Sequence, residues 1–179
     1  MRHVMVDEES PLFVPNYVAE SIEDIDFGVL KKSGIKFIAF DADSTLVGYR
    51  KKKLEESTRS FLHKELAKFN SVCIASNRVT NDLDNIAHDI KATVIRASLT
   101  KRKPSTRFFD RVVDHFNAPP SQIAMIGDKL IADIFGGNKA GLTTIWVNKR
   151  GRDSIFDRIL QTRRFERYLT RRHIKKTNN

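Results

Sequence analysis

Five short apolar runs separated by helical patterns constrain the fold of this chain more than any other feature of its sequence. Between the runs, apolar residues recur at the spacing of a helix face. Because strands that alternate with helices form parallel sheets covered on both faces, we expect a three-layer α/β/α, Rossmann-like fold. The predicted strands are 35–41, 71–75, 92–95, 122–126 and 143–147, and the predicted helices between them are about 54–69, 80–90, 105–117 and 130–140.

The flanking segments carry weaker signals. Residues 11–34 are expected to form a loop with one or two short helical turns, ended by Gly34. A last helix is expected over about 153–171. The chain of 179 residues contains no internal repeat and no low-complexity linker, so residues 1–179 are predicted to form one domain.

Composition excludes several classes of protein. With 40% hydrophobic and 30% charged residues, the sequence is typical of a globular rather than a disordered protein. No apolar run approaches the roughly 18 residues of a membrane-spanning helix. Asp7, Glu8 and Glu9 near the start argue against a secretory signal or a transit peptide. Cys73 is the only cysteine, so no intramolecular disulfide can form and a cytoplasmic, reducing location is expected.

The net charge of +10 is concentrated near the end of the chain. Residues 149–179 hold eleven Lys or Arg against three acidic residues, which gives +8, whereas residues 1–148 hold twenty-one against nineteen, which gives +2. Such a basic tail predicts attraction to an anionic partner, either lipid headgroups or nucleic acid. The alternative is a solvated helix that only keeps the protein soluble.

The run at 35–41 leads into two carboxylates one residue apart, Asp41 and Asp43. Side chains alternate along a strand, so the two carboxylates point the same way as the strand ends. Like charges this close are costly unless a cation, a shared proton or water relieves them. Ligands bind at the carboxyl ends of strands in open α/β sheets, so the pair predicts a site. From this stretch alone, a turn stabilised by Asp, Ser and Thr side chains is an equal alternative.

The other strands supply further polar residues to the same edge of the predicted sheet, because parallel strands end together. Three or more carboxylates converging with a lysine predict a Mg²⁺ site that also binds phosphate. The residues expected there are Asp41, Asp43 and Thr45 after the first strand, Ser76 and Asn77 after the second, Lys103 after the third, and Asp128 and Asp133 after the fourth.

Four motifs in this order resemble those of the haloacid dehalogenase (HAD) phosphatase superfamily. They are Asp41-Ala42-Asp43-Ser44-Thr45-Leu46, Ser76-Asn77, Lys103-Pro104, and Gly127-Asp128 followed by Asp133. Flanking stretches, among them Leu12-Phe13-Val14-Pro15 and Arg163-Arg164-Phe165-Glu166, are similar to a narrower group, the subfamily IIIA phosphatases of YqeG type. That group includes phosphatidylglycerophosphate (PGP) phosphatases, and the resemblance covers roughly residues 12–170. Ser44 departs from the Asn of many members.

The resemblance implies a role for each motif residue. Asp41 would be the nucleophile that forms an aspartyl-phosphate, and Asp43 would protonate the leaving alcohol and then activate water. Mg²⁺ would be held by Asp41, Asp128 and the backbone carbonyl of Asp43, while Asp133 would orient Lys103 or a metal-bound water. The residues implied in phosphate binding are Ser76 and Lys103, with support from Asn77 and either a contact or a turn-stabilising role for Thr45.

Substrate and partners are less constrained. The gaps from Asp43 to Ser76 and from Asn77 to Lys103 leave no room for a cap domain, so an open edge is expected. Arg78 is expected to contact substrate, and basic residues surround the edge: Arg50, Lys51, Lys52, Lys53, Lys101, Arg102 and Lys129. PGP is the leading substrate, with peripheral contact at the inner face of an anionic membrane. The alternatives are a phosphatase of nucleic-acid ends or soluble phosphomonoesters, and a nucleic-acid-binding module with a vestigial site.

Overall fold

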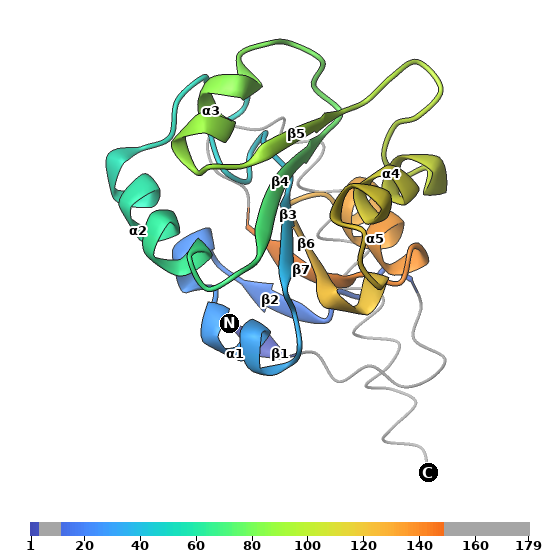
Figure 1. Cartoon of the computed structure of the whole chain (residues 1–179), viewed down its shortest axis with the longest axis horizontal. Coiled ribbons are helices and arrows are strands. Elements are labelled where there is room, and N and C mark those ends of the chain that lie inside the picture. The colour runs from blue at the N-terminus through green and yellow to red at the C-terminus, as the bar shows by residue number, and fades with distance from the viewer. Residues whose placement is uncertain (4–11, 149–179) are drawn as a thin grey trace, which may run out of the picture.

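The computed structural model describes residues 1–3 and 12–148. Within them, seven strands form one sheet in the order β1-β2-β7-β6-β3-β4-β5 (Figure 1). The strands are β1 (Arg2–His3), β2 (Tyr17–Ala19), β3 (Phe37–Phe40), β4 (Ser71–Ser76), β5 (Thr93–Arg96), β6 (Ile123–Gly127) and β7 (Thr143–Val147). Six strands run parallel, and β1 joins the edge antiparallel to β2. The predicted parallel sheet is confirmed.

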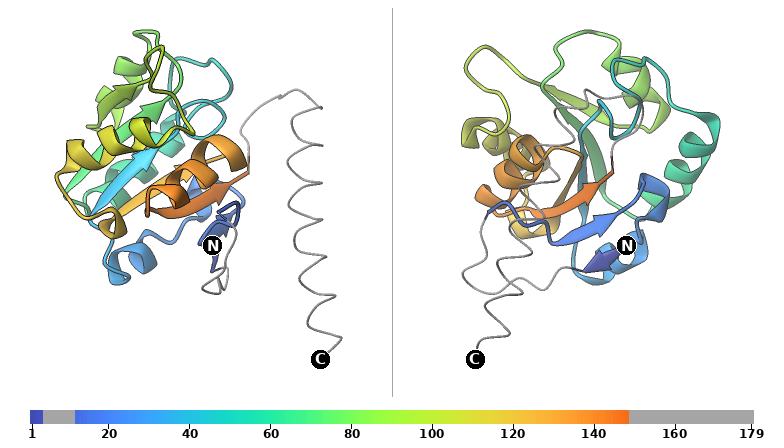
Figure 2. Two further views of the ribbon diagram at one scale, coloured as in Figure 1. Left: turned by 90° about the vertical axis from the view of Figure 1, so that its right-hand side faces the viewer. Right: turned by 180° about the vertical axis from the view of Figure 1, so that it is seen from behind.

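Helices cover both faces of this sheet. Figures 1 and 2 show α2 and α3 on one side and α4 and α5 on the other. No cap domain interrupts residues 12–148. The helices and helical turns are η1 (Ile22–Asp24), α1 (Phe27–Lys32), α2 (Glu56–Leu66), α3 (Leu83–Asp89), α4 (Thr106–Phe116), η2 (Pro120–Gln122), η3 (Leu130–Phe135) and α5 (Gly136–Lys139).

The alternation of side chains along β3 divides the core into two layers. Ile38 and Phe40 pack with the apolar faces of α1, α2 and α3, whereas Ala39 packs with Phe108 and Phe109 of α4. All five side chains are fully buried. Because apolar side chains leave β3 in both directions, the strand reads as a continuous apolar run and occupies the centre of the sheet.

The central position of β3 gathers the ends of its neighbours. Phe40 lies opposite Ile74 of β4 on one side and Ile126 of β6 on the other. The backbone N–H of Asp41 continues this pairing, donating to the carbonyl of Ile126 over 2.8 Å. The segments that follow β3, β4 and β6 therefore start side by side, which is the geometry that the sequence predicted for the motif residues.

One part of the prediction differs from the structure, and another is not tested. The helical turns expected within 11–34 are present as η1 and α1, but Tyr17–Ala19 forms strand β2 instead of loop. Its three residues are too few for a periodic signal, and its conformation depends on pairing with β7 far along the chain. The helix expected over 153–171 lies outside the described residues. Within the described ranges, no helix is both long and apolar enough to cross a membrane.

Candidate active site

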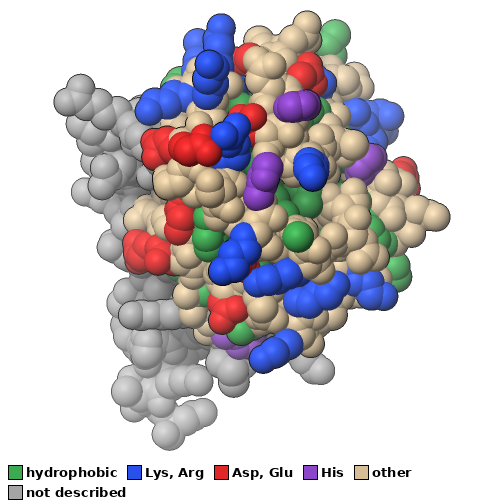
Figure 3. Space-filling model, turned by 60° about the vertical axis from the view of Figure 1, so that its left-hand side comes forward, with side chains coloured by type: hydrophobic (Ala, Val, Ile, Leu, Met, Phe, Trp, Pro, Cys, Tyr) green, Lys and Arg blue, Asp and Glu red, His purple; other side chains and the backbone are tan. Residues whose placement is uncertain are grey.

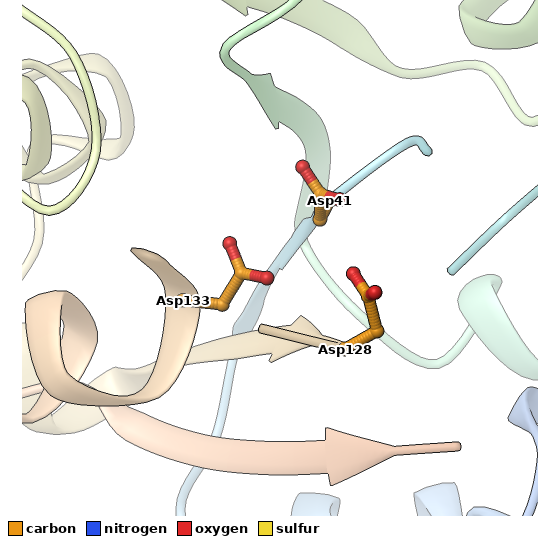
Figure 4. Close-up of side chains that lie close together, drawn as sticks. All are labelled: Asp41, Asp128 and Asp133. Atoms are coloured by element: carbon orange, nitrogen blue, oxygen red, sulfur yellow. The ribbon is translucent and has the colours of Figure 1, made fainter. Parts of the chain in front are cut away.

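Three buried carboxylates converge at the carboxyl edge of the sheet. Asp41 follows β3, Asp128 follows β6, and Asp133 lies in η3. Each offers an oxygen within 4.8 Å of the oxygens of the other two. Figure 4 shows the three side chains rising into the same space from separate elements. Carboxylates buried this closely repel one another unless positive charge lies among them.

The conformation of η3 aims Asp133 at this site. Leu130–Phe135 forms a π-helical segment, a widened turn that is frequent at functional sites. Asp133 accepts a hydrogen bond from the backbone N–H of Lys129 over 3.0 Å. Its side chain packs directly on Gly127, where a Cβ atom would lie 2.4 Å from the Asp133 carboxyl carbon. Residue 127 must therefore be glycine for Asp133 to take this position.

Lys103 supplies the first positive charge. Its ammonium donates to Asp41 Oδ1 and to Asp133 Oδ1, each over 2.6 Å, and the lysine side chain is buried. Asn77 fixes the loop that carries it, accepting from the backbone N–H of Lys103 over 2.9 Å and donating to its carbonyl over 3.1 Å. Asn77 and Lys103, two of the four residues expected to bind phosphate, are thus linked through the backbone of Lys103.

Burial and charge set the ionisation of these groups. Burial opposes ionisation of Asp41, but Lys103 and Lys129 outweigh it and hold the pKa of Asp41 below its ordinary value. Burial and the neighbouring charge of Asp41 raise the pKa of Asp133, despite Lys103. The pKa of Lys103 is raised because Asp133 and Asp41 outweigh its own desolvation. Asp41 is therefore held as a carboxylate, the form that a nucleophile requires.

Lys129 is a contact that the sequence reasoning missed, since it was assigned to the outer rim. Its ammonium lies 3.4 Å from Asp41 Oδ2 and 3.7 Å from Asp128 Oδ1, while the side chain stays partly exposed. Despite desolvation, Asp41 and Asp128 raise the pKa of Lys129. The sequence did contain a signal for this contact. Lys129 directly follows Gly127-Asp128, and a residue that follows a carboxylate at the end of a strand lies next to the site.

Asp128 is held from two further sides. The Thr45 hydroxyl donates to its Oδ1 over 3.3 Å, so Thr45, predicted as a phosphate contact or a turn residue, supports Asp128 here. The indole N–H of Trp146 donates to the Asp128 carbonyl over 2.9 Å. Gly127 and Trp146 are paired between β6 and β7, which brings the indole to this loop.

Asp43 stands beside the carboxylate cluster and is paired with Arg78. The Arg78 Nε donates to Asp43 Oδ2 over 3.1 Å, and its Nη2 donates to Oδ1. The backbone N–H of Arg50 donates to the same Oδ1 over 2.9 Å. Arg78 also reaches Asp82 Oδ2 and the carbonyl of Lys51, each over 3.2 Å. The predicted contact of Arg78 with substrate stays a prediction, and in the structure its guanidinium contacts Asp43.

The second strand contributes Ser76 and Cys73. Ser76 ends β4 and is buried, and its hydroxyl accepts from the backbone N–H of Arg78 over 3.1 Å. Cys73 lies inside β4 with no exposed surface, and burial raises the pKa of its thiol despite Lys103. A buried thiol of this kind is neither a nucleophile nor a metal ligand, so Cys73 belongs to the core.

The donor set fits a divalent cation. Asp41, Asp128 and Asp133 bring three carboxylates against the two ammonium groups of Lys103 and Lys129. Carboxylate oxygens are the ligands that hard divalent cations prefer. A buried cluster with more carboxylates than cationic groups gains stability from one further positive charge.

Comparison with known proteins identifies the family of this chain. Residues 2–151 match the family described as "Mitochondrial PGP phosphatase". The chain is 27% identical over 180 residues to the chloroplastic/mitochondrial phosphatidylglycerophosphate phosphatase 1 of Arabidopsis thaliana, covering 96% of this chain and 51% of that protein. It is 27% identical over 135 residues to the probable phosphatase YqeG of Bacillus subtilis (strain 168), covering 75% and 77%. The chain thus spans about half the length of the plant relative.

Solved structures share the fold. A 2-haloacid dehalogenase from Pseudomonas syringae pv. Tomato DC3000 superposes with a TM-score of 0.51 at 17% identity, over 68% of this chain and 90% of that one. An uncharacterized protein from Corynebacterium glutamicum gives a TM-score of 0.53 at 18% identity, over 70% and 89%. Because residues 2–151 make up most of the chain, it belongs to the mitochondrial PGP phosphatase family.

Proposed function

We propose that this protein is a Mg²⁺-dependent phosphatase that removes the terminal phosphate of PGP and leaves phosphatidylglycerol. The observation that carries the proposal is the buried Asp41 carboxylate, held ionised by Lys103 next to Asp128 and Asp133. A carboxylate kept charged in a buried site, with cations ready to receive a phosphate, suits nucleophilic attack on phosphorus.

The reaction proceeds in two displacements at phosphorus. Asp41 forms a bond to phosphorus while the bond to the lipid alcohol breaks, and Asp43 gives its proton to the departing oxygen. Asp43 then takes a proton from water, which attacks the aspartyl-phosphate, frees phosphate and restores Asp41. Lys103 and Ser76 bind the transferring oxygens, and Asn77 keeps the Lys103 loop in place.

The metal would be held by Asp41, Asp128 and Asp133, together with the backbone carbonyl of Asp43. When bound, Mg²⁺ supplies Lewis-acid stabilisation of the negative charge that Asp41 and the phosphate bring together. The chain's own part is to present oxygen ligands from β3, β6 and η3 in a buried setting.

The proposal of a lipid substrate has separate support. The described chain carries no cap domain over the site, so a phosphate on a bulky group can approach. Exposed Lys and Arg side chains lie around it, each contributing about 1 kcal/mol of attraction near an anionic bilayer. The plant relative is named for the same lipid. For location, the buried lone cysteine supports a reducing compartment, with peripheral contact at the cytoplasmic face of a membrane.

The test is phosphate release from PGP in mixed micelles, with Mg²⁺ or with EDTA. The Asp41→Asn protein, which keeps the shape but lacks the nucleophile, is the matched control. Mg²⁺-dependent release that the control lacks supports both the chemistry and the substrate. Release from p-nitrophenyl phosphate without release from PGP would keep the chemistry and remove the lipid.

A further inference from the structure

Several exposed apolar side chains of the described residues lie in the loops and turns that follow strands at the active-site edge. Among the described residues, seven large hydrophobic side chains are exposed, and four of them follow successive strands at the carboxyl edge. These four, here called the apolar tips, are Tyr49 after β3 (56% exposed), Val79 after β4 (63%), Leu99 after β5 (100%) and Ile131 after β6 (47%). Each catalytic loop or turn therefore presents one apolar side chain to solvent.

Basic side chains accompany the tips. Tyr49 is followed by Arg50, Lys51, Lys52 and Lys53, and Leu99 by Lys101 and Arg102, all exposed. Neither 48–53 nor 98–102 contains an acidic residue. The Arg50 guanidinium lies 5.4 Å from the centre of the Tyr49 ring. Figure 3 shows Lys and Arg side chains at the upper left of the drawn face, and further Lys and Arg side chains across its lower half.

The combination of apolar and basic side chains favours a lipid bilayer over a nucleic acid as the anionic partner. Phosphate groups of a nucleic acid would be attracted by the lysines and arginines but would gain nothing from aliphatic Val79, Leu99 and Ile131. A bilayer offers anionic headgroups and, a few ångströms deeper, an apolar layer. Apolar side chains at loop ends with basic side chains behind them match both layers, and tyrosine is enriched at that boundary.

We propose that the catalytic edge itself docks on an anionic lipid bilayer. The apolar tips enter the boundary between headgroups and acyl chains, while the exposed basic residues of 50–53 and 101–102 lie against the headgroups. The site then opens onto the membrane surface, and a phosphorylated headgroup reaches Asp41 without the lipid leaving the bilayer. This inference rests on the proposed function for the identity of the lipid that is hydrolysed, but the docking surface is independent of turnover.

A dye at a chosen position reports this orientation. Cys73 is buried, so a Leu99→Cys variant has one accessible thiol in the described chain for an environment-sensitive nitrobenzoxadiazole dye. Val29→Cys is the matched control, because Val29 is exposed (39%) on α1, which precedes β3 and lies at the opposite edge. Vesicles of phosphatidylcholine with and without phosphatidylglycerol are the probe. We expect a blue shift and brightening at position 99 with phosphatidylglycerol vesicles and no change at position 29.

Co-sedimentation measures the contribution of the tips. In the Asp41→Asn background, where no lipid is consumed, a Val79→Ser/Leu99→Ser protein should bind phosphatidylglycerol vesicles at least about tenfold more weakly, whereas Val29→Ser should bind as its parent does. The basic tail is the same in all of these proteins, so a difference in vesicle binding measures the contribution of the catalytic edge. Hydrolysis of p-nitrophenyl phosphate by the serine variants with Asp41 intact checks that they fold.

Three results would overturn the docking proposal: equal spectra at positions 99 and 29, unchanged vesicle binding by the double serine variant, or equal binding to vesicles without phosphatidylglycerol. Failure of the proposed function is a separate outcome. A dye shift confined to position 99, with no phosphate release from PGP, would support the docking surface and remove the substrate. Phosphate release from PGP without a dye shift at position 99 would support the substrate and overturn the docking surface.

Discussion

At the scale of single residues, the pair of Asp43 and Arg78 shows how a neighbouring side chain positions a catalytic group. A bidentate guanidinium fixes the plane of the Asp43 carboxylate, and the same guanidinium contacts Lys51 and Asp82. This geometry makes Arg78 a positioning residue for the proposed acid and base. A lysine offers one compact ammonium and cannot reproduce the two-point contact.

We therefore expect Arg78→Ala and Arg78→Lys to lower kcat for p-nitrophenyl phosphate by about tenfold or more with little change in KM. Added guanidinium should restore part of the kcat of Arg78→Ala and none of that of Asp43→Asn. Steady-state kinetics across guanidinium concentrations are the measurement. A raised KM with unchanged kcat would instead support the substrate contact that the sequence suggested.

Lys103 is the residue on which the buried charges depend. Without it, Asp41 and Asp133 lose their shared cation, and breaking a buried ion pair costs about 3–5 kcal/mol. We expect Lys103→Met to lower the free energy of unfolding of the metal-free protein by about this amount at neutral pH. Lys139→Met is the control, because Lys139 of α5 is exposed.

The loss of stability in Lys103→Met should depend on pH. The pKa of Asp41 is lowered in the folded protein, so its pairing contributes stability above the unfolded value of 3.8 and loses it as pH falls through the lower folded value. The difference between wild type and Lys103→Met should therefore shrink toward acid pH. Urea unfolding at several pH values measures it, and a difference that grows in acid would contradict the account.

At the scale of elements, Gly127 shows how β6 and η3 fit together. A methyl group at this position would lie 2.4 Å from the Asp133 carboxyl carbon, so Asp133 must move. We expect Gly127→Ala to lower stability by about 1–3 kcal/mol and the phosphatase rate by at least about tenfold. Gly28→Ala is the control, because its methyl group would meet only Asp26 Oδ1, at 3.1 Å. Normal activity in Gly127→Ala would contradict the close packing.

Elements also show what the sequence can predict. The five apolar runs are local signals, and each lies on a strand of the structure because buried parallel strands need continuous apolar side chains. The common location of the motif residues could also be predicted from the sequence, since parallel strands end at one edge of the sheet. Strand β2 was missed because pairing with β7 creates it. The contacts of Arg78 with Asp43 and of Lys129 with Asp41 could not be predicted, because they depend on how the loops after β4 and β6 approach the two carboxylates after β3.

At the scale of the whole molecule, the sheet brings three buried acidic side chains together at its carboxyl edge. A cation bound by Asp41, Asp128 and Asp133 in the native state alone would stabilise the fold by mass action, by about 2.7 kcal/mol at a hundredfold excess over Kd. We expect Mg²⁺ to raise Tm, EDTA to reverse the rise, and Asp128→Asn to remove it. Thermal unfolding at matched ionic strength tests this, and a shift reproduced by Na⁺ alone would contradict a specific site.

The most direct test of the account is to trap the phosphorylated enzyme. Rapid acid quenching with radiolabelled PGP or p-nitrophenyl phosphate, followed by peptide mapping, locates the transferred phosphoryl group. The account predicts label on Asp41 and none in Asp41→Asn. With p-nitrophenyl phosphate, whose leaving group needs no proton from Asp43, it predicts more label in Asp43→Asn, where water is not activated. Phosphate release with no labelled protein, or label on another residue, would contradict Asp41 as the nucleophile.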